Sequence, residues 1–416
     1  MQWRGIFRNR ELWDWHLMMY FLNIFLVVYG YGLRGEAFQA AKLFRTGLVV
    51  VALLGVVFAQ GQVKYIFNQQ KNWALYGFIG LNLIVLPFSV NVLWSFERLA
   101  AWIPFLIYNN YFIIYLFKQY SKDEAKIKLL QIFSLVYFYP VVVMFGTGMA
   151  FQTENVYGQY VGAYKANVIG WACTMFVVCS FDLYANRNMP RWLQFLFLCM
   201  ALLTLWAIVL TGSRSSYVGL ALSSAILIAR NQKISIYFKA AALSCILAFA
   251  YYIVASPDSV VNLRSKYAGM RRQRGEIRFQ LAKKAFDVFT NDPGVLFTGF
   301  GFDNFRAGLE IYADVRTDLA SHNSYLEILF SGGILTFLFF LIFYVINAFW
   351  VYIRYDSPYY VFLPSLMIIP YFESNLNAGQ FLFFPWMTVL FYYIHVRSLQ
   401  IPVQEMSLSK TSKGEA

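Results

Sequence analysis

Apolar runs recur along almost the whole chain, with short polar connections between them. A helix that crosses a membrane needs about 20 mostly apolar residues, and about twelve runs come near this length. The pattern predicts an all-α, polytopic integral membrane protein with about 12 transmembrane helices. The predicted spans centre on residues 13–33, 44–60, 73–91, 99–118, 128–150, 166–185, 192–211, 215–230, 235–255, 323–350, 358–371 and 380–396.

The composition supports a membrane protein and excludes an ordinary soluble domain. Hydrophobic residues make up 59% of the 416 residues and charged residues only 13%, whereas a soluble domain has roughly 25% charged residues. Aromatic residues reach 20%, and they favour the boundary between membrane and water. We expect membrane lipids as partners. The formal net charge of +13 fits basic cytoplasmic loops, and we expect no nucleic-acid partner.

Basic residues in the short connections set the predicted orientation. Every even-numbered connection carries Lys or Arg, so these connections and both chain termini are expected on the cytoplasmic side. The chain then divides into four parts. They are residues 1–255 with transmembrane helices 1–9, residues 256–322 as a basic periplasmic loop, residues 323–397 with helices 10–12, and residues 398–416 as a cytoplasmic tail.

The loop 256–322 is basic, yet it is expected on the outer side. Its positive charge does not contradict this location, because long loops can cross a membrane regardless of charge. Its stretch EIRFQLAKKAFDVF (276–289) predicts an amphipathic helix at the outer membrane surface. Arg271, Arg274 and Arg278 share one face if the helix extends back through Gly275. They could hold a diphosphate or an acidic glycan, or the loop could bind anionic lipid headgroups. The apolar positions of the helix are Ile277, Leu281, Ala285 and Val288.

A tight turn of small residues lies between the seventh and eighth predicted spans, in TGSRSSYVGL (211–220). Arg214 is at its centre, next to Ser213 and Ser215, and the next helix is expected to start there. A helix N-terminus together with a guanidinium group makes a site for an anion, phosphate above all. The alternative is that Arg214 only extends from a helix end to the membrane surface.

The stretch SHNSYLEILFSGG (321–333) joins a polar loop to a long apolar run. Ser324 and Glu327 have the spacing of a capping box, which predicts a helix that begins near Ser324. His322 and Asn323 then lie just before its first turn, at the outer face of the membrane. A histidine there can accept a proton from a hydroxyl group. The alternative is a hydrogen-bonded histidine of the interface with no chemical role.

Glycines mark two further segments. The stretch LFTGFGFDNFRAGLE (296–310) does not follow a strand of a βαβ unit, so we expect a loop with an unusual backbone path rather than a nucleotide fold. Gly332 and Gly333 are expected to allow a close neighbour to their helix. The sequence has no Walker motif, no Asp-x-Asp pair and no His/Cys metal cluster, and its four cysteines lie in apolar runs. We expect no metal and no cofactor.

Together these segments resemble the O-antigen ligase and O-antigen polymerase superfamily, GT-C-like enzymes of bacterial envelope glycans. The Gly-Ser-Arg turn, the Arg-led helix followed by Gly-x-Gly-x-x-x-Phe and the His-Asn-x-x-Leu stretch occur in that order. The resemblance covers roughly residues 165–350. The matching residues are Arg214, Arg278, Gly299, Gly301, Phe305, His322, Asn323, Leu326 and Gly333.

The resemblance implies a metal-independent, inverting glycosyltransferase of the bacterial inner membrane, with its active site facing the periplasm. Such enzymes move a glycan from undecaprenyl diphosphate to an acceptor hydroxyl group. His322 and Arg214 are the expected catalytic residues. His322 would orient the acceptor hydroxyl group and act as its general base, and Arg214 would face the leaving diphosphate. Further contacts with diphosphate or substrate are expected from Arg278, Asn323, Ser213, Ser215 and Arg274.

The acceptor separates two activities that share these motifs. A ligase uses lipid A–core, whereas a polymerase uses a second lipid-linked glycan, and ligase is our prediction. A transporter of lipid-linked sugars would instead place charged residues near the middle of the spans, but the spans here are nearly uncharged. A structural scaffold of the envelope machinery is the remaining class.

Overall fold

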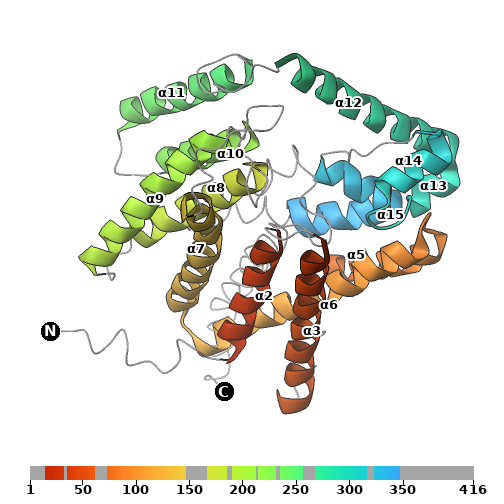
Figure 1. Cartoon of the computed structure of the whole chain (residues 1–416), viewed down its shortest axis with the longest axis horizontal. Helices are drawn as coiled ribbons and strands as arrows, with labels where there is room; N and C mark the ends of the chain where they lie inside the picture. The colour runs from red at the N-terminus through yellow and green to blue at the C-terminus, as the bar shows by residue number, and fades with distance from the viewer. Residues whose placement is uncertain are drawn as a thin grey trace, which may run out of the picture.

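Every regular element in the part of the chain that the structure describes is a helix, which confirms the all-α fold class (Figure 1). The computed structural model describes residues 15–31, 35–60, 73–146, 166–184, 190–211, 214–230, 235–255, 268–315 and 323–346.

The helices follow the apolar runs closely in the first 255 residues. In this part they are α2 (Trp15–Tyr31), α3 (Gly35–Gln60), α5 (Trp73–Ile84), the short 3-10 helix η3 (Leu86–Phe88), α6 (Val92–Gln119), α7 (Lys122–Gly146), α8 (Ala166–Tyr184), α9 (Arg191–Thr211), α10 (Arg214–Arg230) and α11 (Ile236–Ala255). After them come α12 (Ala268–Asn291), α13 (Pro293–Thr298), α14 (Phe305–Ala313), α15 (Ser324–Phe340) and the π-helical turn η6 (Leu341–Ile346).

Several predicted spans have different bounds from those expected. The run 44–60 belongs to α3, which already starts at Gly35, and the run 128–150 belongs to α7, which starts at Lys122. The run 73–91 is helical only to Ile84, because the chain then turns through η3, which contains Pro87. The run 99–118 belongs to a helix that already starts at Val92, where the side chain of Asn91 accepts a hydrogen bond from the backbone N–H of Trp94 at 3.0 Å. The predicted spans 358–371 and 380–396 lie outside the described residues.

Four of the described helices are long and apolar enough to cross a membrane. They contain the segments Val92–Leu116, Ile127–Gly146, Arg191–Thr211 and Ser324–Ile346. Shorter apolar helices include Trp15–Gly30 and Trp73–Ile84. These helices support an integral membrane protein, while the total of about 12 spans and the sidedness of the loops stay predictions.

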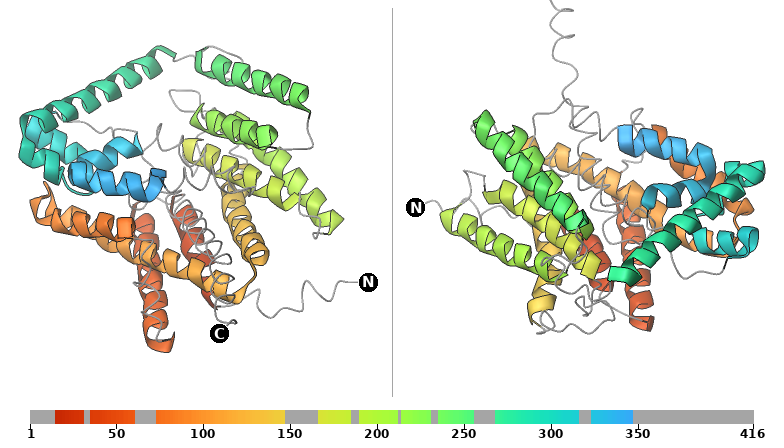
Figure 2. Two further views of the ribbon diagram at one scale, coloured as in Figure 1. Left: turned by 180° about the vertical axis from the view of Figure 1, so that it is seen from behind. Right: turned by 90° about the horizontal axis from the view of Figure 1, so that it is seen from above.

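Two hydrophobic cores hold the helices together. The larger core joins helices from α2 to α10 with α15 and η6, and within it α8 packs against α7, α9 and α10. The smaller core contains Leu281 and Ala285 of α12, Leu309 of α14, and Phe330 of α15, with Phe300 between them. Figure 1 shows α12 crossing the top of the molecule from the end of α11 to the α13–α15 group, and Figure 2 shows the same arrangement from behind and from above.

Candidate functional site

The start of α10 is held by hydrogen bonds to two neighbouring helices. The phenol of Tyr217 donates a hydrogen bond back to the carbonyl of Val209 in α9 at 3.2 Å. The hydroxyl of Thr174 in α8 lies 3.3 Å from the carbonyl of Ser216, to which it can donate. The first turn of α10 is therefore held against both neighbouring helices.

Helix α10 begins at Arg214, as the sequence predicted. The first backbone N–H groups of a helix have no partner within it, so they face whatever lies before the helix. Arg214 and Ser215 are in this first turn. Ser213 lies outside the described residues.

Helix α12 confirms the amphipathic pattern expected for 276–289. Leu281, Ala285 and Val288 are buried in the smaller core, and Ile277 packs against it. The helix runs without interruption through Gly275. Arg274 and Arg278 are therefore one turn apart on the same face of α12.

The glycine-spaced loop connects two distant parts of the chain by backbone hydrogen bonds. The N–H of Phe300 donates to the carbonyl of Phe330 at 2.7 Å, and the N–H of Gly301 donates to the carbonyl of Ser331 at 2.9 Å. The carbonyl of Phe300 in turn accepts from the N–H of Val90 at 2.9 Å. Residues 299–301 thus run between α15 and the turn that precedes α6.

Helix α15 is broken at the point where this loop meets it. Gly333 has φ 72° and ψ −177°, which is not helical. In an unbroken helix, the carbonyls of Phe330 and Ser331 would accept hydrogen bonds from the N–H groups four residues later. The break leaves these two carbonyls free to accept from the glycine-spaced loop. A Cβ atom on Gly333 would overlap the carbonyl of Phe297, and one on Gly299 would lie 2.5 Å from the carbonyl oxygen of Ser331. The predicted close neighbour of Gly333 is therefore the backbone at the end of α13, directly before this loop.

The start of α15 lies where the sequence predicted it, but the cap differs by one residue. The N-cap is Asn323 rather than Ser324. Its side-chain oxygen accepts hydrogen bonds from the N–H groups of Tyr325 at 3.0 Å and Leu326 at 3.1 Å. Asn323 was predicted to contact the substrate, and its side-chain oxygen stabilises the start of α15. His322 directly precedes the cap and lies outside the described residues.

A comparison with protein families matches this part of the chain. Residues 199–341 match the family model described as O-antigen ligase. We call residues 199–341 the ligase domain, after the family model that they match. The match confirms the resemblance and runs from the second half of α9 through α15. It supports a membrane function of the O-antigen ligase or polymerase type. No curated protein matches the chain.

The ligase domain is tied to α6, which lies outside the matched residues, by an ion pair. The Nε atom of Arg98 is 3.1 Å from Oδ2 of Asp303, directly after the glycine loop. The indole N–H of Trp94 donates to the carbonyl of Asp303 at 3.2 Å. The guanidinium of Arg98 also lies 4.1 Å from the centre of the Trp94 ring. The charge of Arg98 is thus compensated within the fold.

The buried side-chain amide of Asn304 adds hydrogen bonds between the ligase domain and α6. Asn304 is only 2% exposed, and its Nδ2 donates to the carbonyl of Asn91 at 3.1 Å and to Oγ of Ser95 at 2.9 Å. The hydroxyl of Ser95 donates to the carbonyl of Phe302 at 3.1 Å. We call Ser95, Arg98, Asp303 and Asn304 the α6 clamp. Sequence reasoning missed it, because its members are about 200 residues apart and no local pattern relates them.

Replacing Asn304 with Ala is expected to destabilise the protein. Two hydrogen bonds disappear, and the buried Ser95 hydroxyl and Asn91 carbonyl lose a partner, which costs about 1–3 kcal/mol. Thermal unfolding of the full chain in detergent, followed by tryptophan fluorescence, measures the loss as a lower Tm. Asn291→Ala removes the same amide from an exposed position of α12 and is the matched control. Equal Tm values for the two variants would contradict a stabilising clamp.

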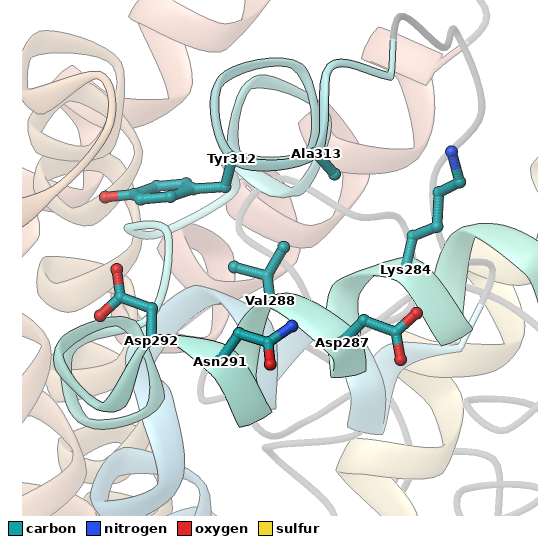
Figure 3. A pocket seen from close by; sticks show the side chains of 7 residues that line it. All are labelled: Lys284, Asp287, Val288, Asn291, Asp292, Tyr312 and Ala313. Carbon is teal, nitrogen blue, oxygen red and sulfur yellow. The ribbon is translucent and has the colours of Figure 1, made fainter.

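The ligase domain also carries an open pocket that the sequence did not predict (Figure 3). Its volume is about 410 Å³, and it lies where the second half of α12 meets the end of α14. The lining side chains include Lys284, Asp287, Val288, Asn291, Asp292 and Tyr312.

The described residues contain no group of three or more His, Cys, Asp or Glu side chains that could hold a metal ion. The metal independence of the reaction stays a prediction, because His322 and other parts of the chain are outside this description.

Proposed function

We propose that the protein is a multi-pass membrane glycosyltransferase that moves a glycan from undecaprenyl diphosphate to a hydroxyl group of lipid A–core. The O-antigen ligase match over residues 199–341 carries this proposal. It is supported by the positions of the three motifs. Arg214 opens α10, Arg278 lies in α12, and His322 directly precedes the cap of α15.

In the proposed reaction, the oxygen of the acceptor hydroxyl attacks the anomeric carbon of the donor sugar. A bond forms between these two atoms while the bond from the carbon to the diphosphate oxygen breaks, so the configuration at the carbon inverts. Undecaprenyl diphosphate leaves with the electron pair of the broken bond. The proton of the hydroxyl group passes to His322, which acts as the general base.

The leaving diphosphate needs positive charge and hydrogen-bond donors where its own charge develops. Arg214 would supply a guanidinium beside the first N–H groups of α10, which is a favourable combination for phosphate. Arg278 would supply a second cation from α12, with Arg274 one turn away. Ser213, Ser215 and Asn323 would add hydrogen bonds. Guanidinium groups in these roles make a metal ion unnecessary.

The reaction would take place on the periplasmic side of the bacterial inner membrane, with both chain termini in the cytoplasm. The distribution of Lys and Arg over the short connections supports this orientation. A lipid-linked donor and an acceptor in the outer leaflet would both reach a site at this face.

The acceptor decides between ligase and polymerase. The purified full chain in lipid nanodiscs would be incubated with undecaprenyl-diphosphate-linked glycan, alone or together with lipid A–core, in the presence of EDTA. We expect glycan on lipid A–core, detected as a gel shift and by mass. A ladder of longer lipid-linked glycans without lipid A–core would establish a polymerase instead. No product in either mixture, from folded protein, would overturn the transferase proposal and favour transport.

A further inference from the structure

The pocket between α12 and α14 is lined by charged, polar, apolar and aromatic side chains. Lys284, Asp287, Val288 and Asn291 recur at helical spacing, so they share one face of α12. Tyr312 covers this face from α14, and Figure 3 shows its ring extending over Asp292. A volume of about 410 Å³ is within the range of about 300–1,000 Å³ that is usual for sites of small ligands.

Two of the lining groups are held in place by the fold. The Oδ1 atom of Asp292 accepts hydrogen bonds from the N–H groups of Gly294 at 2.9 Å and Val295 at 3.2 Å, as the cap of α13. The ring of Tyr312 stacks on the buried ring of Phe300, with centroids 5.7 Å apart and 24° between the planes. The carboxylate and the aromatic surface are thus preorganised, which lowers the entropy cost of binding a ligand.

The other polar groups are available to a ligand. Within the described ranges, the side chains of Lys284, Asp287 and Asn291 are engaged in no hydrogen bond or ion pair with the protein. Carboxylates accept hydrogen bonds, the amide both donates and accepts, and the ammonium group donates. The pocket therefore offers several kinds of hydrogen-bonding group around the apolar side chain of Val288.

The charges of the pocket exclude a diphosphate as its ligand. Asp287 and Asp292 carry two negative charges against one positive charge on Lys284, and like charges repel. The pocket residues also lie on a different face of α12 from Arg274 and Arg278. The pocket is therefore separate from the proposed diphosphate contacts, although both belong to the ligase domain.

A neutral sugar residue is complementary to the polar groups and the aromatic ring that line this pocket. Its hydroxyl groups donate to carboxylates and to the amide oxygen, and they accept from the amide and ammonium N–H groups. Its C–H face packs on an aromatic ring that has a polar tip, as Tyr312 has. We infer that this pocket binds a neutral sugar residue of the donor or acceptor glycan, several residues along α12 from Arg278. The assignment of the ligand to these glycans rests on the proposed function.

Binding of free oligosaccharide tests the pocket without any catalysis. The full chain in nanodiscs would be titrated with two probes, and the Kd measured by thermophoresis. One probe is the oligosaccharide released by mild acid from the undecaprenyl-diphosphate-linked glycan, and the other is the deacylated core oligosaccharide of lipid A–core. Whichever probe binds identifies the side of the reaction that the pocket serves.

Substitutions in the wall should weaken binding of that probe. We expect Tyr312→Ala and Asn291→Ala to raise its Kd by at least about tenfold, the equivalent of one good contact. Asn291 is exposed, so its variant keeps the fold even if loss of the Tyr312 ring disturbs Phe300. Lys283→Ala changes an exposed neighbour that does not line the pocket and should leave the Kd unchanged.

The results separate this inference from the proposed function. Wild type that binds neither probe, or equal Kd values for wild type and both wall variants, would overturn the sugar pocket even if glycan transfer occurs. Wild type that binds one probe through Tyr312 and Asn291 would support the pocket even if no transfer is detected.

Discussion

His322→Ala is expected to reduce glycan transfer by about 10²–10⁴-fold, the usual contribution of a general base. The residue directly precedes Asn323, whose side chain caps α15. The side chain of Asn323, the residue next to the proposed base, thus holds the start of α15. Loss of the imidazole removes the proton acceptor, so we expect kcat to fall more than the affinity for the donor.

The same assay would compare three further variants. Arg214→Ala should also abolish most of the transfer, because a cation facing the leaving diphosphate is lost. Arg214→Lys keeps the charge but not the forked geometry and should retain part of the activity. His395→Ala changes a histidine outside the ligase domain and serves as the control. Wild-type rates for His322→Ala and Arg214→Ala would remove both residues from the mechanism.

Gly333→Ala is expected to be among the most destabilising single substitutions in the described part of the chain. The backbone at φ 72° and ψ −177° lies in a region that is essentially restricted to glycine, and strain there costs about 1–3 kcal/mol. The added Cβ would also overlap the carbonyl of Phe297, a backbone atom that cannot move away as a side chain can. The end of α13 must shift, and the hydrogen bonds that the following glycine loop makes to Phe330 and Ser331 would weaken.

Thermal unfolding of the full chain should show a clear decrease in Tm for Gly333→Ala. Gly80→Ala is the matched control, because Gly80 is helical and a Cβ atom there has open space. Alanine is favoured over glycine within a helix by about 1 kcal/mol, so the control should be neutral or slightly more stable. A Gly333 variant as stable as this control would mean that the break in α15 is not required by the fold.

The sequence predicted those features that depend on local patterns. The apolar runs located the helices, and the spacing of Ile277, Leu281, Ala285 and Val288 gave the buried face of α12 correctly. The glycine-spaced loop does have an unusual backbone, with φ 69° at Gly299 and 97° at Gly301. Each of these signals is contained in a few neighbouring residues, which is why they can be read without the fold.

Features that depend on distant partners could not be predicted. Hydropathy placed the start of the fourth span at 99 because Glu97 and Arg98 are charged, whereas the helix contains both. The negative charge of Asp303 compensates the positive charge of Arg98, and nothing near either residue in the sequence indicates this ion pair. The pocket was missed for the same reason, since Tyr312 and Asp287 meet only through the packing of α14 on α12.

Capping motifs show how closely related signals can differ. Ser121 and Glu124 do form a capping box at the start of α7, where the hydroxyl of Ser121 accepts from the N–H of Glu124 and the carboxylate accepts from the N–H of Ser121. Ser324 and Glu327 have the same spacing, yet Asn323 is the cap of α15. An Asn directly before the Ser competes for the role, because its side-chain amide is at least as good a cap.

The α6 clamp has a consequence for exchanging domains between related proteins. The boundaries of the family match, 199 and 341, do not enclose a self-sufficient unit, because Asp303 and Asn304 find their partners on α6. A fragment cut at those boundaries would leave a buried amide and a carboxylate without Ser95 and Arg98. A chimaera that transplants the ligase domain must therefore carry residues 89–98 of the same parent, or supply a host helix with a serine and an arginine in matching positions.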